Sequence, residues 1–163
     1  MSLYKPQLNK GCALKVILYP DVSDRSEIIT LLGENLHAMG VVKIGYAQEV
    51  IAREEEYPTG LQLTGQYNIA LPHGGPDLVN ENAIIVGVLK DSLEFFMMGE
   101  PQKSIPVHIV FMFAAVDYNS INKYVQNLVD GVLLKPEIVR EIIELSDEEM
   151  ILSKLEDSIL SDS

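Results

Sequence analysis

The sequence predicts an α/β fold in which helices cover both faces of a mixed central β-sheet. Residues 83–89 and 107–113 are short runs of almost continuous apolar residues, as expected of strands that are buried on both sides. Segments with apolar residues at helical spacing precede and follow these two runs. Strands and helices that alternate in one chain pack in layers, and the pattern favours a mixed sheet over a purely parallel one.

The first half of the chain is expected to begin with a strand and two helices. Residues 13–19 form a short apolar run and predict the strand. Asp24 followed by Glu27 resembles a capping box, so a helix should begin here and end near Gly40. A second helix is predicted at about 42–56, where apolar residues again recur at helical spacing.

The middle of the chain leads from a helix break to the two apolar runs. Residues 57–60, with the sequence Tyr-Pro-Thr-Gly, should end the second helix because proline cannot continue helical hydrogen bonding. Residues 68–71 predict a short strand. This strand runs directly into a turn rich in glycine and proline at 72–76, and the turn contains His73.

Three helices are expected to close the chain. Apolar residues at helical spacing mark the first, between about 121 and 132. Pro136 suits the first turn of the second helix, where its missing N–H group has no helical partner to lose. Ser146 with Glu149 forms another capping-box pattern, which makes Ser146 the expected N-cap of the third helix.

Length, charge and cysteine content exclude several classes of protein. A chain of 163 residues fits one domain, 1–163, that needs neither a disulfide nor a metal to fold. The single cysteine excludes a disulfide framework and a multi-cysteine zinc site. A net charge of −12 argues against nucleic acids and anionic membranes and favours a basic protein partner. Without a signal peptide or an apolar run of about 20 residues, a cytoplasmic location is expected.

His73 is the strongest candidate for chemistry. It follows a predicted strand in a turn of small residues, so that a macromolecule could reach its side chain. Strand ends are common functional positions in open α/β sheets, and an imidazole can act as nucleophile or base near neutral pH. From the residues alone, an ordinary surface-loop histidine is the alternative.

The sequence around this histidine also resembles a known family. Residues 69–73, Ile-Ala-Leu-Pro-His, resemble the active-site motif of enzyme IIA (EIIA) domains of the bacterial sugar phosphotransferase system (PTS), in the mannitol–fructose (type 2) superfamily. Arg53-Glu54 and the run Tyr-Pro-Thr-Gly-Leu at 57–61 are similar to the galactitol-specific branch in particular. The resemblance extends over residues 16–155, nearly the whole chain.

The resemblance implies a phosphotransferase that carries a phosphoryl group as phosphohistidine. His73 would accept the group from the phosphocarrier protein HPr and pass it to a cysteine of a cognate enzyme IIB (EIIB). Arg53 is the cation that the motif implies for the phosphoryl oxygens, whereas the residues alone favour an exposed arginine paired with Glu49 or Glu56. The resemblance implies no cofactor, no metal and no direct contact with the sugar.

Phosphoryl transfer to an imidazole has two physical requirements. The ring must be neutral to attack phosphorus, and members of the family use the Nε2 nitrogen. The other nitrogen, Nδ1, must be fixed as a hydrogen-bond donor, which a backbone carbonyl would achieve. The phosphoryl oxygens in turn need cationic or N–H donors, because such transfer depends mainly on positioning and electrostatics.

One position departs from the family pattern. Many relatives carry a second active-site histidine at the start of the helix after the second apolar run, and Ser120 stands there in this chain. Its hydroxyl can donate to a phosphoryl oxygen but brings no positive charge. A regulatory binding module, whose phosphorylation state controls a partner protein, is therefore a second candidate function. A hydrolase with His73 as base is a third, for which the sequence holds no triad motif.

The other reactive side chains are expected to be structural. His108 lies inside an apolar run and should be buried and hydrogen-bonded, while His37 falls off its helical stripe and should face solvent. Cys12 precedes the first strand and should be an inert, packed thiol. The acidic residues 54–56 are interpreted as a solvated helix end. Three methionines are expected in the core: Met97, Met98 and Met112.

Overall fold

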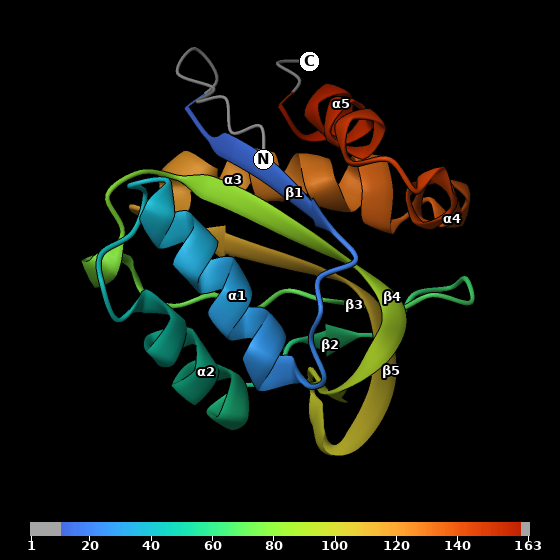
Figure 1. The fold of residues 1–163 in the computed structure, drawn as a ribbon, viewed down its shortest axis with the longest axis horizontal. Helices are drawn as coiled ribbons and strands as arrows, with labels where there is room; N and C mark the ends of the chain where they lie inside the picture. The colour runs from blue at the N-terminus through green and yellow to red at the C-terminus, as the bar shows by residue number, and fades with distance from the viewer. Residues whose placement is uncertain (1–10, 161–163) are drawn as a thin grey trace.

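A computed structural model describes residues 11–160 of the chain (Figure 1). Within this range, five strands form one mixed sheet in the order β1-β4-β2-β3-β5, and helices pack against both of its faces. The predicted fold class, an α/β structure with a mixed sheet between two helical layers, is confirmed.

The elements alternate along the chain much as the sequence predicts. The strands are β1 (Ala13–Leu18), β2 (Gly60–Leu61), β3 (Ile69–Ala70), β4 (Ala83–Met97) and β5 (Glu100–Ala114). The helices are α1 (Arg25–Ala38), α2 (Tyr46–Glu56), α3 (Tyr118–Leu128), α4 (Pro136–Leu145) and α5 (Glu148–Ile159). A 3-10 turn η2 (Pro76–Leu78) and a π-helical turn η3 (Val129–Leu133) complete the described elements.

A long antiparallel hairpin of β4 and β5 forms the frame of the sheet. β1 lies parallel beside the first half of β4, with Ala13 opposite Ala83 and Leu18 opposite Val88. The hairpin register shifts between Val88 and Leu93, where β4 curves strongly (Figure 1). β2 pairs with the far end of β4, while β3 pairs with β2 and with β5. The two short strands therefore connect the tip of the hairpin, at Met97, to the middle of β5, at Ile109 and Val110.

Both hairpin strands are longer than the sequence predicts. The apolar runs at 83–89 and 107–113 indicate only the buried halves, whereas each strand has 15 residues. The additional halves contain the exposed residues 90–92 and 100–104, and the turn between the strands holds Gly99 at φ 83°. Beyond these exposed residues, the buried side chains of Leu93, Phe95 and Ile105 alternate with exposed ones, so a search for continuous apolar runs misses this part of the hairpin.

Two hydrophobic clusters fill the space between the sheet and its helices. On one face, α1 and α2 pack on residues such as Ile85 and Met112. On the other face, α3, η3, α4 and α5 cover residues such as Ile84 and Phe111. Adjacent strand residues point to opposite faces, and this explains why the apolar runs of β4 and β5 are continuous.

The capping pattern at the start of α1 is confirmed. The Asp24 carboxylate accepts a hydrogen bond from the Glu27 backbone N–H at 2.9 Å, and the Glu27 carboxylate accepts one from the Ser23 N–H at 2.7 Å. These bonds satisfy amides that a helix N-terminus leaves without helical partners. The helix ends just before Gly40, which adopts φ 80°.

α2 begins four residues later than the sequence predicts. Gly45 adopts φ 96° immediately before the first helical residue, Tyr46. Val42, predicted to lie on the helix, instead forms an isolated antiparallel bridge with Val79. Its apolar side chain is buried in either arrangement, so hydrophobic spacing does not distinguish them.

The predicted N-cap of α5 is wrong by one residue. Asp147 is the N-cap, and its carboxylate accepts from the Met150 N–H at 3.0 Å. Ser146 ends α4 in a left-handed conformation with φ 50°. Pro136 lies in the first turn of α4, as predicted. None of the helices in residues 11–160 combines the length and the apolar character needed to cross a bilayer.

Candidate active site

His73 lies shortly after β3, against the end of β5. A parallel backbone bridge pairs it with Phe113, and the two rings stack with centroids 4.4 Å apart and planes 15° from parallel. The imidazole is half-buried. One face of the ring is therefore covered by an aromatic side chain.

The backbone fixes the proton of this imidazole. Nδ1 of His73 lies 2.9 Å from the carbonyl oxygen of Leu71. A carbonyl oxygen can only accept, so the contact places the proton of the neutral ring on Nδ1 and leaves the lone pair on Nε2. Burial lowers the pKa of His73, and the charge of Arg53 lowers it further, although the bond to Leu71 acts in the opposite direction. The ring is therefore neutral near pH 7, with Nε2 available as a nucleophile.

Helix α2 holds the turn that follows the histidine. The Gly74 N–H donates to the Tyr46 hydroxyl at 3.0 Å, and this hydroxyl donates to the Phe113 carbonyl at 2.9 Å. The Gly75 N–H donates to the Glu49 carboxylate at 2.5 Å. A Cβ atom at Gly74 would lie 2.7 Å from the same carboxylate, so a side chain there would displace the Glu49 carboxylate. Because both glycine amides already have acceptors, phosphoryl oxygens need other donors.

Arg53, the cation predicted for these oxygens, lies in the last turn of α2. Its guanidinium carbon lies 5.7 Å from the ring centroid of Tyr57, and the residue is half-buried. Within residues 11–160 it forms no ion pair, so the alternative of pairing with Glu49 or Glu56 is wrong. Its charge instead influences His73, whose pKa it lowers. A guanidinium in this position offers several N–H groups in a fixed plane, which suits phosphoryl oxygens.

Ser120 lies in the first turn of α3, with its hydroxyl already in use. The oxygen accepts from the Asn82 amide at 2.9 Å and donates to the Asp117 carbonyl at 3.3 Å. The shallow depression beside His73 is lined by Asp117 and Tyr118 of the same segment, but not by Ser120. The sequence gives no functional signal for Tyr118, which is 62% exposed.

Glu54 is the main correction to the sequence-based interpretation. It does not belong to a solvated helix end but is only 5% exposed, and its carboxylate accepts from the Thr59 N–H and hydroxyl, each at 2.8 Å. Burial raises the pKa of the Glu54 carboxyl, and the bonds from Thr59 oppose this effect. The signal in the sequence is the spacing of Tyr46, Val50 and Glu54, four residues apart on one helix face. A carboxylate on a buried face requires hydrogen-bond partners.

The remaining predicted roles are mostly confirmed. His108 is half-buried and accepts from the Asn68 N–H at 3.3 Å, and His37 is exposed. Cys12 is 2% exposed, and burial raises the pKa of its thiol to about 12, so it is unreactive in the folded protein. Of the three methionines expected in the core, only Met98 is exposed. Residues 11–160 contain no cluster of three or more side chains suited to binding a metal.

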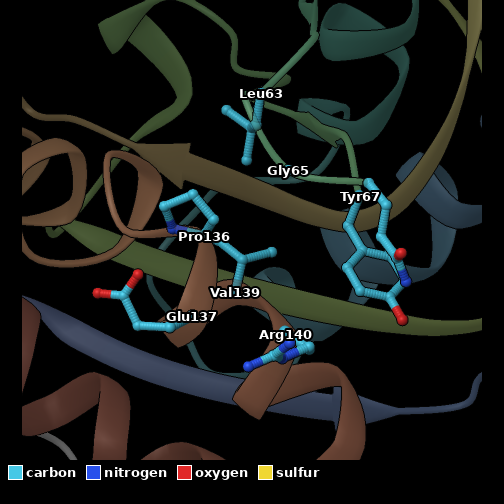
Figure 2. Close-up of a pocket in the computed structure, with 8 residues that line it drawn as sticks. Leu63, Gly65, Tyr67, Pro136, Glu137, Val139 and Arg140 are labelled. Atoms are coloured by element: carbon cyan, nitrogen blue, oxygen red, sulfur yellow. The ribbon is translucent and has the colours of Figure 1, made fainter.

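A larger cavity, of about 350 Å³, lies elsewhere on the molecule (Figure 2). Leu63 and Tyr67, from the connection between β2 and β3, line one side of it, and Pro136 and Arg140 of α4 line the other. Neither His73 nor any other predicted site residue contributes to this cavity. The candidate active site is instead the shallow surface around the histidine, which suits a macromolecular partner.

Comparison with known proteins identifies the family. The model of the family described as "Phosphoenolpyruvate-dependent sugar phosphotransferase system, EIIA 2" matches residues 13–158. A curated relative from Escherichia coli K12, the "PTS system galactitol-specific EIIA component", is 30% identical over 128 residues, which cover 78% of this chain and 83% of the relative.

Solved structures share the fold at lower identity. IIA mannitol from Escherichia coli has a TM-score of 0.68 at 20% identity, with 90% of this chain and 96% of that chain covered. The complex of enzyme IIAMTL and phosphorylated enzyme IIBMTL from the same species matches with a TM-score of 0.68 at 20% identity, covering 86% and 92%. The nitrogen regulatory protein IIA-Ntr from Neisseria meningitidis matches with a TM-score of 0.61 at 18% identity, covering 90% and 93%.

The resemblance seen in the sequence is therefore confirmed by the family match and by the fold. The chain belongs to the type 2 EIIA family of the phosphoenolpyruvate-dependent sugar phosphotransferase system, whose members are phosphotransferases that use a phosphohistidine intermediate.

Proposed function

We propose that His73 is the residue that carries the phosphoryl group in this EIIA component. The observation that supports this most is the 2.9 Å contact between Nδ1 and the Leu71 carbonyl, which leaves the lone pair on Nε2. Nε2 attacks the phosphorus of a phosphorylated donor protein, and the new P–N bond forms as the bond to the donor's nitrogen breaks. In the second step a thiolate attacks the same phosphorus, and the P–N bond of His73 breaks as a P–S bond forms.

The proposed donor is HPr, and the proposed acceptor is the cysteine of a cognate EIIB. The solved complex of a structurally similar enzyme IIA with a phosphorylated enzyme IIB supports the second partner. The net charge of −12 favours encounter with a basic carrier protein. The 30% identity to a galactitol-specific EIIA component supports a role in a galactitol-like transport system, in which this component is proposed to be cytoplasmic. In this role the chain does not contact the sugar.

Two side chains are proposed to support the transferred group. Arg53 binds phosphoryl oxygens through its guanidinium and offsets their negative charge. Ser120 is the weaker candidate, because its hydroxyl must leave the Asp117 carbonyl, 3.3 Å away, to donate to phosphate. It would add a neutral hydrogen bond and no charge.

The test is phosphoryl uptake from phosphoenolpyruvate in the presence of the general PTS components. The wild-type protein should gain one acid-labile phosphoryl group on His73, detected by mass spectrometry, and His73→Ala should gain none while keeping its melting temperature. Arg53→Gln should slow uptake roughly 100-fold, as the loss of one charged donor at a reacting group does. Ser120→Ala should slow it by less than about tenfold, because a neutral hydrogen bond contributes about 1 kcal/mol.

The matched control is His37→Ala, which removes an exposed histidine of α1 and should leave uptake unchanged. Uptake that persists in His73→Ala, or depends on His37, would refute the assignment of the carrier residue.

A regulatory module is the second candidate function, favoured by Ser120 at the position of the second histidine and by the fold shared with a nitrogen regulatory protein. Addition of purified EIIB distinguishes the transport function from the regulatory function. Transfer of the labelled group to the EIIB cysteine supports the transport role. Label that forms on His73 but reaches no EIIB supports regulation, and the absence of label on His73 refutes both.

A further inference from the structure

A chain of buried and partly buried hydrogen bonds connects Glu54 to the imidazole of His73. The Glu54 carboxylate accepts from both the backbone N–H and the hydroxyl of Thr59, at 2.8 Å each. The Thr59 hydroxyl oxygen in turn accepts from the Leu71 N–H at 3.1 Å. The carbonyl of this same leucine accepts from Nδ1 of His73 at 2.9 Å.

The direction of these bonds is fixed by the groups that make them. A hydroxyl has one proton, and Thr59 donates it to the Glu54 carboxylate, which only accepts. The lone pairs of the Thr59 oxygen therefore face the Leu71 N–H. Thr59 is 6% exposed and Glu54 5% exposed, so water does not compete for these bonds. Loss of the carboxylate would leave the hydroxyl free to rotate away from Leu71.

The Leu71 side chain packs on the cluster beneath α3, α4 and α5, and the next carbonyl, of Pro72, accepts from the Phe113 N–H at 3.3 Å, but the Leu71 N–H itself has few restraints. The pairing of β2 with β3 ends one residue earlier, at Ala70, and the other contact of the Leu71 N–H, to the Thr59 carbonyl, is long at 3.4 Å. Pro72 follows and has no N–H to donate. The Thr59 hydroxyl is thus the closer of two acceptors for the last amide before the histidine.

We propose that Glu54 and Thr59 are positioning residues that orient the Leu71 carbonyl and thereby keep the proton of His73 on Nδ1. The inference rests on the proposed function, in which Nε2 must present its lone pair to phosphorus. Neither residue touches the phosphoryl group. Their effect is to increase the fraction of protein molecules whose imidazole is in the reactive tautomer.

The experiment measures this tautomer directly. The ¹⁵N chemical shifts of the two ring nitrogens of His73, recorded in the unphosphorylated protein, report which nitrogen carries the proton. Thr59→Val keeps the shape of the side chain but removes the hydroxyl. Glu54→Gln replaces one of the two carboxylate acceptors by an NH₂ donor. Both variants should populate the Nε2–H tautomer and slow phosphoryl uptake at least tenfold.

Two control variants should behave like the wild type. Thr59→Ser retains a hydroxyl and should restore the Nδ1–H tautomer. Glu55→Gln removes the adjacent, exposed carboxylate of the same helix and should change neither measurement. Melting temperatures show which variants are folded, and if Thr59→Val fails to fold, Glu54→Gln provides the same test.

The outcomes distinguish this inference from the function on which it rests. If Thr59→Val and Glu54→Gln retain the wild-type tautomer, the positioning role is refuted, even if uptake slows. A shifted tautomer with unchanged uptake would refute its importance for the reaction. If the wild-type protein never becomes phosphorylated on His73, the proposed function fails, and the tautomer comparison still decides whether Glu54 and Thr59 position the ring.

Discussion

At the scale of single residues, the reactivity of His73 depends on its protonation state. Burial lowers its pKa most, the charge of Arg53 lowers it further, and the bond to Leu71 opposes both. A pKa below the unfolded value of about 6.5 means that folding favours the neutral ring. The corresponding contribution to stability is fully present above that value and is lost as the pH falls through the folded-state pKa.

Replacement of Arg53 should therefore raise the pKa of His73. In Arg53→Gln the repulsion between guanidinium and imidazolium is absent, and NMR titration of the ring should show a higher pKa than in the wild type. The wild-type rate of phosphoryl uptake should begin to fall at a lower pH than it would for an imidazole with the ordinary pKa of about 6.5. In the variant this fall should begin at higher pH.

Two control variants separate charge from geometry. Arg53→Lys keeps the charge and should leave the pKa low, although uptake slows because an ammonium cannot bind two oxygens in one plane. Arg140→Gln, at the separate cavity, should leave both unchanged. An unaltered titration in Arg53→Gln would contradict the electrostatic explanation.

The sequence indicates the proposed reactive side chains more directly than the side chains that hold them. His73 and Arg53 are indicated by a local motif, which can be read without knowledge of the fold. The buried role of Glu54 depends on Thr59, beyond the end of its helix, and that of Tyr46 on the turn at Gly74. Such partners come together only when the chain folds. Local spacing therefore reveals that a side chain is buried but not which groups it contacts.

At the scale of the elements, the position of α2 depends on close packing against α1. A Cβ atom built at Gly33 of α1 would lie 2.6 Å from the Cβ atom of Ala47 in α2, well inside van der Waals contact. α2 also carries Tyr46 and Glu49, which hold the turn after His73, and Arg53, whose charge lowers the pKa of His73. A shift of this helix should therefore affect both stability and activity.

Gly33→Ala should destabilise the protein although alanine is the better helix former. Helix propensity favours alanine by about 1 kcal/mol, but overpacking typically costs 1–3 kcal/mol, so a net loss of about 1 kcal/mol is expected. The melting temperature should fall by a few degrees and phosphoryl uptake should slow. Gly131→Ala is the matched control, because its Cβ atom would meet Ser158 at an ordinary 3.4 Å. A melting temperature raised by Gly33→Ala would show that the two helices can separate freely.

Element boundaries differ from prediction where exposed residues interrupt a continuous apolar run or where backbone conformation decides the boundary. The outer half of the β4–β5 hairpin begins with the exposed residues 90–92, and beyond them the buried residues Leu93, Phe95 and Ile105 alternate with exposed ones. At the α4–α5 junction, Ser146 and Asp147 are both good N-caps, and the left-handed turn at Ser146 decides between them. A search for continuous apolar runs detects neither feature, whereas it detects the two buried runs.

At the scale of the whole molecule, the sheet separates two hydrophobic clusters that the sequence predicts to form one domain. Cys12 belongs to the cluster beneath α3, α4 and α5, and Gly33 lies on the opposite face, in α1. With a pKa of about 12, the buried thiol should react with iodoacetamide only when the protein unfolds. Its alkylation therefore reports on unfolding from one side of the sheet.

If both faces unfold together, Gly33→Ala should accelerate alkylation of Cys12 by the same factor by which it increases the unfolded population. A loss of 1.4 kcal/mol corresponds to about a tenfold faster reaction when labelling follows the unfolded population. Mass spectrometry of timed samples gives the rate, and the guanidinium-unfolded chain gives its upper limit. Alkylation that does not respond to Gly33→Ala would show that the two layers open independently and would contradict the prediction of one cooperative domain.

The stacking of Phe113 on His73 has a consequence for how the two partner proteins bind to the proposed carrier. Because Phe113 shields one face of the imidazole and Nδ1 is hydrogen-bonded, a partner protein can reach Nε2 only along the outer edge of the ring. The protein that delivers the phosphoryl group and the protein that collects it must then approach through the same narrow angle. The two proteins cannot bind at the same time, so turnover has to alternate between them. A large excess of either one should therefore inhibit binding of the other.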